Sequence, residues 1–106
     1  MFSFQRTLQL AVIFVLGASG AAMAQPLGAG HSKFLGGIYS SAQIPNFLNY
    51  FNQVTPENAG KWGSVEATRD VMNWTELDAA YALAKSNGLP FRYHVLGWGS
   101  QQPAWM

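Results

Sequence analysis

The apolar residues change their spacing along the chain, and the spacing predicts where strands and helices lie. A short apolar run at 34–38 has the length of a buried strand, and two further short strands are predicted at 52–55, where Pro56 ends the strand, and at 91–96. Between the first two of these segments, apolar side chains recur at i, i+3, i+4 and i+7, and a proline suits the first turn of a helix. This pattern predicts a helix over 40–49 (Ile44, Pro45, Phe47, Leu48, Phe51).

A second helix, predicted over 74–87, has the clearest boundaries. Thr75 and Asp78 have the spacing of a capping box, Gly88 suits the C-terminal end, and Pro90 blocks continuation. Residues 58–64 are read as a turn or a single helical turn. One apolar stripe predicts the face that the second helix buries (Leu77, Ala80, Tyr81, Ala84).

The predicted order is strand, helix, strand, helix, strand. Such alternation is typical of βαβ units with a parallel sheet, so the fold class is α/β. Functional residues gather at the carboxyl ends of such strands. Glu57, Asn58 and Lys61 follow the second strand, while His94 and Trp98 lie at the end of the third. We therefore expect both groups at one edge of the sheet.

Each of these residues also has an ordinary structural explanation. Glu57, Asn58 and Lys61 suit a solvated loop with a salt bridge and a cap, His94 a hydrogen-bonded core histidine, and Trp98 a core position. Taken together, mixed donors and acceptors beside indole rings favour a sugar, whose hydroxyls do both and whose C–H faces stack on aromatic rings.

The acidic residues predict no catalytic pair. A general acid/base and a nucleophile that work as a pair need two facing carboxyl groups. However, Glu76 and Asp78 open a helix, and Glu66 and Asp70 flank a polar loop. No Ser-His-Asp set and no metal site with three credible ligands can be placed. No cofactor is expected either.

The first 24 residues have the features of a secretory signal peptide. Arg6 precedes a mostly apolar stretch at 8–16, and Ala22-Met23-Ala24 is an A-x-A cleavage pattern. The alternative is a membrane anchor, but the apolar stretch is well short of the ~20 residues that a spanning helix needs. We therefore expect a secreted or periplasmic protein without a membrane partner, cleaved after Ala24, with an irregular leader at 25–32.

Composition narrows the possible partners. The formal net charge is +1, with scattered Lys and Arg residues, so nucleic acid is not an expected partner. The chain contains no cysteine, so a small secreted domain of this length would lack the disulfides that often stabilise such domains. This combination favours a part of a larger aromatic-rich domain.

Three segments resemble the N-terminal part of glycoside hydrolase family 10. They are FNQVTPENAGKWGSVE (51–66), DAAYALAKSNG (78–88) and FRYHVLGWGSQQPAW (91–105), and the resemblance covers 33–106. The family comprises endo-1,4-β-xylanases on a (β/α)8 TIM barrel. The resemblance implies substrate-binding roles toward xylan or xylo-oligosaccharides for six residues (Glu57, Asn58, Lys61, His94, Trp98, Gln101).

The resemblance also implies what the chain lacks. The family cleaves with retention, using two glutamates on later barrel strands. We therefore expect 33–106 to be a truncated catalytic domain, made of about the first three strands of the barrel and the two helices between them, that binds xylan but is inactive alone. The chain departs from the family pattern at Gly97 and Gly99, so the resemblance supports the contacts around Trp98 less strongly than those around Lys61. The alternatives are a non-catalytic secreted carbohydrate-binding domain or an unrelated small secreted βαβ domain.

Overall fold

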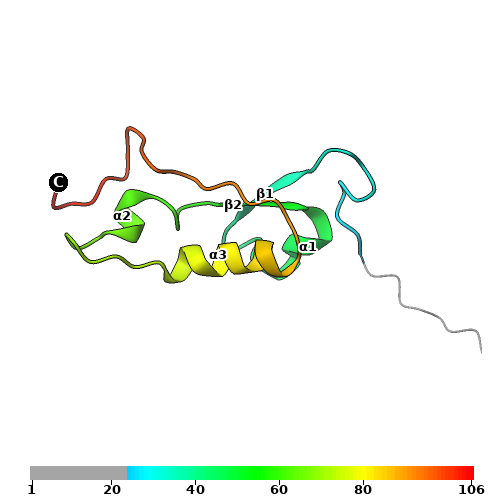
Figure 1. Ribbon diagram of the computed structural model, residues 1–106, viewed down its shortest axis with the longest axis horizontal. Helices are drawn as coiled ribbons and strands as arrows, with labels where there is room; N and C mark the ends of the chain where they lie inside the picture. The colour runs from blue at the N-terminus through cyan, green and yellow to red at the C-terminus, as the bar shows by residue number, and fades with distance from the viewer. Residues whose placement is uncertain (1–23) are drawn as a thin grey trace, which may run out of the picture.

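A computed structural model describes residues 24–106, so the expected signal peptide lies outside the described residues except for Ala24. Figure 1 shows a small α/β unit in which α3 runs alongside the strands and the C-terminal segment passes back toward α2. The elements in chain order are strand β1 (Gly36–Tyr39), 3-10 helix η1 (Ile44–Asn46), helix α1 (Phe47–Tyr50), strand β2 (Gln53–Pro56), helix α2 (Trp62–Val65) and helix α3 (Thr75–Ser86).

The first two predicted strands are confirmed and pair in parallel. Gly37 lies opposite Val54, and Tyr39 lies opposite Pro56. Parallel neighbours need a crossover connection, and η1 with α1 supplies it. The predicted helix over 40–49 is shorter than expected: it is a 3-10 turn followed by one turn of α-helix, and of its apolar stripe only Phe47 is fully buried.

The predicted third strand at 91–96 is wrong in its extent. Phe91 forms a single parallel bridge with Val54, whose N–H donates to the Pro90 carbonyl and whose carbonyl accepts from Arg92. The next donor along β2 would be the backbone nitrogen of Pro56, and proline has no N–H to give. The ladder therefore stops after one rung, and 92–96 continues without strand pairing.

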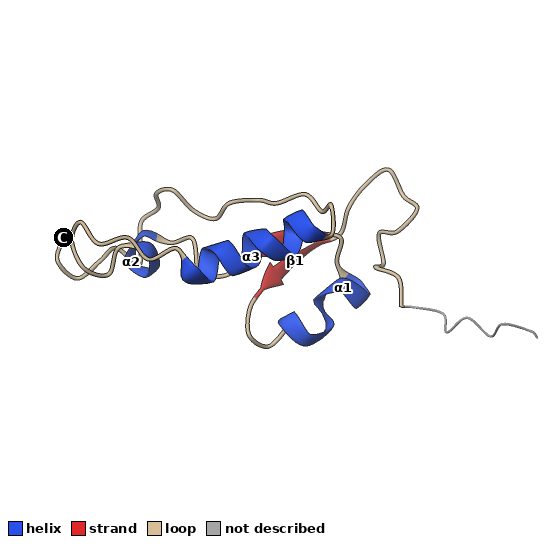
Figure 2. Ribbon diagram, turned by 60° about the horizontal axis from the view of Figure 1, so that its bottom comes forward, coloured by secondary structure: helices blue, strands red, loops and turns tan. Residues whose placement is uncertain are grey.

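The core lies between one face of the two strands and the helices. Phe47, Val54 and Ala84 are buried together, with Phe91 packed at the edge. Phe47 comes from α1 and Ala84 from α3, so both helices contribute to this one cluster, and Figure 2 shows both helices beside β1. Tyr81, predicted to be on the buried stripe, is instead half exposed, with its ring edge-on to Phe91 at a centroid distance of 5.4 Å.

Helix α3 confirms its predicted position but not its predicted cap. Thr75 is already the first helical residue, and its N–H donates to the Asn73 side chain (3.1 Å), so the Thr75–Asp78 capping box does not form. An asparagine two residues upstream offers its own local turn to that N–H and displaces the threonine from the cap. At the other end Gly88 has φ of 62°, and Leu89 N–H returns to the Ala84 carbonyl, as in a Schellman motif.

Candidate functional site

The loop after β2 folds back on itself through Lys61. The Lys61 ammonium donates to the Asn58 side-chain oxygen at 2.7 Å, and the Lys61 backbone N–H donates to the Asn58 carbonyl at 3.0 Å. Lys61 is only 7% exposed, whereas Glu57 and Asn58 are exposed. The hydrogen-bond partner of the ammonium group is thus the Asn58 amide, and this contact fixes the position of the ammonium group.

Trp98 and His94 lie beside the same lysine. The Lys61 ammonium is 5.0 Å from the centre of the Trp98 ring, within cation–π range. The His94 and Trp98 rings are 6.1 Å apart at 56°. Trp98 remains 48% exposed, so indole surface faces outward next to a fixed cation. The predicted meeting of the 57–61 loop with 94–98 is thus what the structure shows.

Backbone contacts hold these two segments together. The Tyr93 hydroxyl donates to the Gly60 carbonyl at 2.7 Å. A Cβ atom at Gly60 would lie 2.5 Å from the His94 carbonyl oxygen, so only glycine allows this approach. Farther along, the Gly63 N–H donates to the Gln101 carbonyl at 3.0 Å. The segment carrying His94 and Trp98 is therefore attached at both ends to the loop carrying Lys61.

Gln101 joins this arrangement through its backbone rather than its side chain. Its φ is 56°, an uncommon conformation for a residue other than glycine, and it turns the carbonyl toward Gly63. Its side chain is exposed. The predicted binding role of the Gln101 side chain remains a prediction, while the backbone contact is a structural role that the sequence analysis did not identify.

A second polar cluster, which the sequence analysis also missed, surrounds Glu66. Its carboxylate accepts hydrogen bonds from Trp62 Nε1 (2.7 Å) and from the Asp70 backbone N–H (2.8 Å). Its backbone carbonyl accepts one from Trp105 Nε1 (2.8 Å). The Trp62 and Trp105 rings meet edge to face at 5.6 Å, and the Arg69 guanidinium lies 5.5 Å from the Trp105 ring. We call this group the Glu66 cluster.

The Glu66 cluster favours the ionised carboxylate. The Trp62 hydrogen bond is the main cause that lowers the pKa of Glu66, followed by the Asp70 N–H and the nearby Arg69 charge, while burial acts in the opposite direction. A carboxylate that is ionised and accepts two hydrogen bonds holds the structure together as a hydrogen-bond acceptor and does not serve as a proton donor. The i, i+4 spacing of Trp62 and Glu66 is the signal in the sequence from which this pair could have been predicted.

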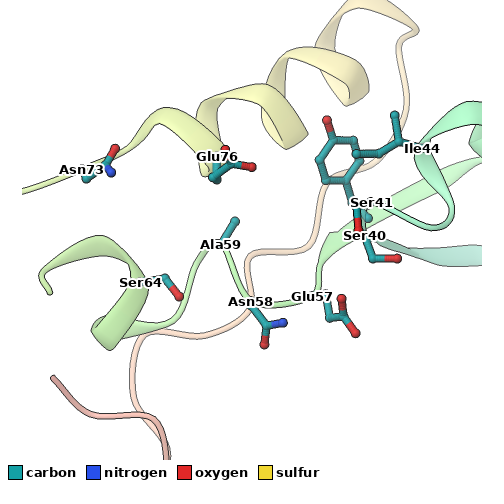
Figure 3. A pocket seen from close by; sticks show the side chains of 10 residues that line it. Ser40, Ser41, Ile44, Glu57, Asn58, Ala59, Ser64, Asn73 and Glu76 are labelled. Carbon is teal, nitrogen blue, oxygen red and sulfur yellow. The ribbon is translucent and has the colours of Figure 1, made fainter. Parts of the chain in front are cut away.

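A pocket of about 300 Å³ opens beside the loop. Figure 3 shows Glu57 and Asn58 on its loop side and Glu76 on the side of α3. The remaining lining comes from the end of β1 and the segment after it, from the loop after β2, from α2 and from the approach to α3 (Tyr39, Ser40, Ser41, Ile44, Ala59, Ser64, Asn73). Two of the six predicted binding residues, Glu57 and Asn58, thus line a defined pocket.

Within residues 24–106, no group of three or more His, Cys, Asp or Glu side chains is arranged to hold a metal ion. No helix in the same range is long and apolar enough to cross a membrane. What the described residues do offer is an ammonium, an amide, a carboxylate and an exposed indole in one place, which is chemistry for binding hydroxyl groups.

Comparison with known proteins gives a consistent result. The sequence profile described as "Glycosyl hydrolase family 10" matches residues 21–106. Endo-1,4-beta-xylanase B of Cellvibrio japonicus is 49% identical over 75 residues, which cover 70% of this chain and 12% of that protein. Endo-1,4-beta-xylanase A of Fusarium oxysporum is 41% identical over 63 residues, or 59% of this chain and 19% of that protein. The chain thus spans less than a fifth of the length of these relatives.

Solved structures show the same similarity. An endo-β-1,4-xylanase from Gloeophyllum trabeum superposes with a TM-score of 0.62 at 27% identity, covering 70% of this chain and 26% of that one. Xylanase 10B from Thermotoga petrophila in complex with xylobiose superposes with a TM-score of 0.56 at 28% identity, covering 67% of this chain and 24% of that one.

Proposed function

Because the chain belongs to glycosyl hydrolase family 10, we propose that it supplies the hydroxyl-binding part of an endo-1,4-β-xylanase. The relatives imply a TIM-barrel fold, and in our proposal residues 33–106 form its first strands and helices, from β1 through α3 to the segment that follows α3. The whole protein would hydrolyse the β-1,4-xylosidic backbone of xylan with retention of configuration. The described segment would hold the sugars on the glycone side of the cleaved bond.

The observation that carries this proposal is the placement of Lys61 against Asn58 and Trp98. The ammonium is buried and already bonded to an amide oxygen, so it is fixed in direction before a ligand arrives. A charged donor that is held in place gives stronger and more selective hydrogen bonds to hydroxyls than a mobile one. The exposed Trp98 ring beside it offers a surface for the apolar face of a sugar.

The remaining predicted residues complete the set of donors and acceptors. The Glu57 carboxylate accepts from two sugar hydroxyls, the Asn58 amide donates, and His94 contacts the sugar next to the scissile bond. Gln101 adds a side-chain amide at the edge of this group of sugar-binding residues. All six are binding roles, and none requires a cofactor.

Residues 33–106 are proposed to bind xylan without cleaving it. Retaining hydrolysis needs two carboxyl groups about 5–5.5 Å apart, one of which must carry a proton. Glu66 is occupied by two hydrogen bonds that favour its ionised form. Catalysis is therefore assigned to glutamates on other strands of the whole protein.

A binding titration tests the proposal. We expect xylobiose to saturate the chain and to change its tryptophan fluorescence through Trp98. Lys61→Met should weaken binding roughly tenfold or more, since a hydrogen bond from a charged group is lost. The control Lys85→Met, an exposed lysine in the last turn of α3, should bind as the unchanged chain does. Equal affinity of both variants would contradict the assignment of Lys61.

An assay of reducing-sugar release from xylan tests the second half of the proposal. The purified chain should release none, while xylobiose binding persists. Turnover that copurifies with the chain, and that Lys61→Met abolishes, would show that the segment carries its own catalytic groups.

The alternative function is a non-catalytic secreted carbohydrate-binding domain. One observation favours it: the contacts that position the predicted binding residues are made within residues 58–101 (Lys61 to Asn58, Tyr93 to Gly60, Gly63 to Gln101). Such a domain would bind xylo-oligosaccharides at millimolar concentration or tighter without other protein segments. Equal affinity of the chain and of a whole relative, such as the Cellvibrio japonicus enzyme, would favour this alternative.

Export is proposed from the N-terminal sequence alone. Residues 1–24 would act as a signal peptide that directs the protein to the periplasm or the medium. Mass spectrometry of the exported protein should find Gln25 at its N-terminus. Retention of Met1 in the exported form would contradict the cleavage site.

A further inference from the structure

Helix α2 lies between the loop that carries Lys61 and the Glu66 cluster. Lys61 occupies its N-cap position and Glu66 its C-cap position, with four helical residues between them. A helix of one turn is not stable through its own hydrogen bonds, because the first turn fixes several residues for very few bonds. The position of α2, and with it the position of Lys61, must therefore be set by contacts from outside the turn.

Glu66 supplies such contacts in three directions. Its carboxylate reaches back along the whole of α2 to accept from Trp62 Nε1 at 2.7 Å, and it accepts from the Asp70 backbone N–H at 2.8 Å. Its backbone carbonyl accepts from Trp105 Nε1 at 2.8 Å. One residue thus joins the start of α2, the loop after α2 and the C-terminal segment.

The C-terminal segment contacts α2 at a second point, close to Trp98. The Gln101 carbonyl accepts from the Gly63 N–H at 3.0 Å, and a Cβ atom at Gly63 would lie 2.7 Å from that carbonyl oxygen. Gln101 follows Trp98 in the sequence by three residues, and Trp105 lies four residues farther on. The segment 98–105 is therefore attached to α2 near its start and again at its end, and Trp98 extends from the first attachment to Lys61.

The contacts of Glu66 and Trp105 leave them outside the group of candidate binding residues. The Trp105 ring meets the Trp62 ring edge to face, and the Arg69 guanidinium lies 5.5 Å from its centre. Neither Glu66 nor Trp105 lines the pocket beside the loop after β2. Any effect of these two residues on a bound sugar must therefore pass through α2 and the side chains that α2 positions.

We propose that Glu66 and Trp105 are positioning residues for sugar binding, which hold Trp98 in place against Lys61 through α2 without touching the ligand. The inference rests on the proposed function, because it takes Lys61 and Trp98 as part of the binding surface. It goes beyond that function by assigning a role in affinity to two residues that contribute no group to the surface. Groups that are already held in position bind a ligand more tightly, because less ordering is needed on binding.

The test measures both xylobiose affinity and the position of Trp98 in the free chain. Trp105→Phe keeps a ring against Trp62 but removes the N–H that binds the Glu66 carbonyl. It should weaken xylobiose binding roughly three- to tenfold. Two-dimensional NMR should show the indole N–H signal of Trp98 shifted in this variant before xylobiose is added, because the ring moves relative to Lys61.

Two Glu66 variants separate the hydrogen-bonded link from the charge. Glu66→Ala removes both carboxylate oxygens and should weaken xylobiose binding at least as much as Trp105→Phe. Glu66→Gln keeps one side-chain oxygen that can accept from Trp62 Nε1, and it should retain most of the affinity. An equal loss of affinity in both Glu66 variants would overturn the proposal, because the charge and not the link would then be responsible.

Ala84→Gly is the destabilising control. Ala84 is buried with Phe47 and Val54 in the apolar core, and glycine within a helix lowers stability. All variants are measured at a temperature at which circular dichroism shows them folded. The control should change neither xylobiose affinity nor the Trp98 signal. A loss of affinity as large as that of Trp105→Phe would mean that general stability sets the affinity, and the positioning proposal would be overturned.

The outcomes also separate this proposal from the proposed function. If xylobiose binds the unchanged chain and Trp105→Phe equally well, the positioning proposal is overturned while the proposed function stands. If xylobiose binds no form of the chain, the proposed function fails and the positioning proposal fails with it.

Discussion

Two regions of the molecule are stabilised by different interactions, the region of β1, β2, α1 and α3 and the region around α2. Between β1, β2, α1 and α3, stability comes from apolar burial, with Phe47, Val54 and Ala84 almost fully covered. Around α2, it comes from directed hydrogen bonds, with Glu66 joining two tryptophans and a turn. The apolar end forms the scaffold, whereas the polar end positions Lys61 and Trp98. The difference indicates that the candidate binding residues depend on geometry that hydrophobic patterning alone does not provide.

The largest effect is expected in the apolar core. Phe47→Ala should lower the free energy of unfolding by about 3–5 kcal/mol, because it removes a buried aromatic side chain and leaves a cavity. Ile44→Ala, on the same predicted stripe but 44% exposed, should cost less than about 1 kcal/mol. Urea unfolding followed by circular dichroism measures both. Equal costs would mean that Phe47 is not the centre of the core.

A smaller effect is expected where the two segments of the site meet. Gly60→Ala places a Cβ atom against the His94 carbonyl and should cost about 1–3 kcal/mol while displacing His94 from Trp98. Gly97→Ala has open space around it and serves as the control. Xylobiose affinity should fall for Gly60→Ala only. Wild-type affinity in that variant would show that the close contact does not position the site.

In the Glu66 cluster, Trp105→Phe keeps an aromatic ring but removes the indole N–H that binds a backbone carbonyl. The expected cost is about 1–2 kcal/mol in unfolding free energy, typical of a lost hydrogen bond that leaves its partner unpaired. Trp74→Phe, which changes a half-exposed tryptophan, provides the matched control by the same urea titration. A cost no larger than the control's would show that the C-terminal segment does not depend on this bond.

The two ends also differ in how far the sequence predicts them. Periodicity identified β1, β2 and α3, as well as Leu77, Ala80 and Ala84 as buried, because burial of apolar side chains leaves a regular spacing. It failed for 92–96 because a single proline in the neighbouring strand removes one donor. Helix capping failed because local side-chain hydrogen bonds compete over two or three residues.

The candidate site was predicted in part for a similar reason. The position of polar residues after two strands correctly placed the Lys61 loop beside His94 and Trp98. The Glu66 cluster was missed because its tryptophan and glutamate partners come from 62–70 and 105, and a contact over 39 residues leaves no periodic trace. The backbone role of Gln101 depends on its φ angle, which residue type does not indicate.

The smallest expected effect is the change of folding stability at low pH that the Glu66 carboxyl group causes. A carboxyl group whose pKa is lower in the folded than in the unfolded chain contributes stability that is complete above its unfolded value, near 4.5 for Glu66. That contribution is lost as the pH falls through the folded pKa. The cause is that the carboxyl group has the higher pKa in the unfolded chain, so the unfolded chain binds the proton first. Unfolding titrations at pH 7 and at several values below 4.5 should therefore show the chain losing stability toward acid, and Glu66→Gln losing less.

The causes of the Glu66 shift can be ranked by the same experiment. Trp62→Phe removes the hydrogen bond that lowers the pKa of Glu66 most, whereas Arg69→Leu removes only the weaker effect of a nearby charge. The acid-dependent loss of stability should shrink strongly in the first variant and slightly in the second, and only the Arg69 contribution should weaken with added salt. The opposite ranking would mean that charge, and not directed hydrogen bonding, controls the polar end of the molecule.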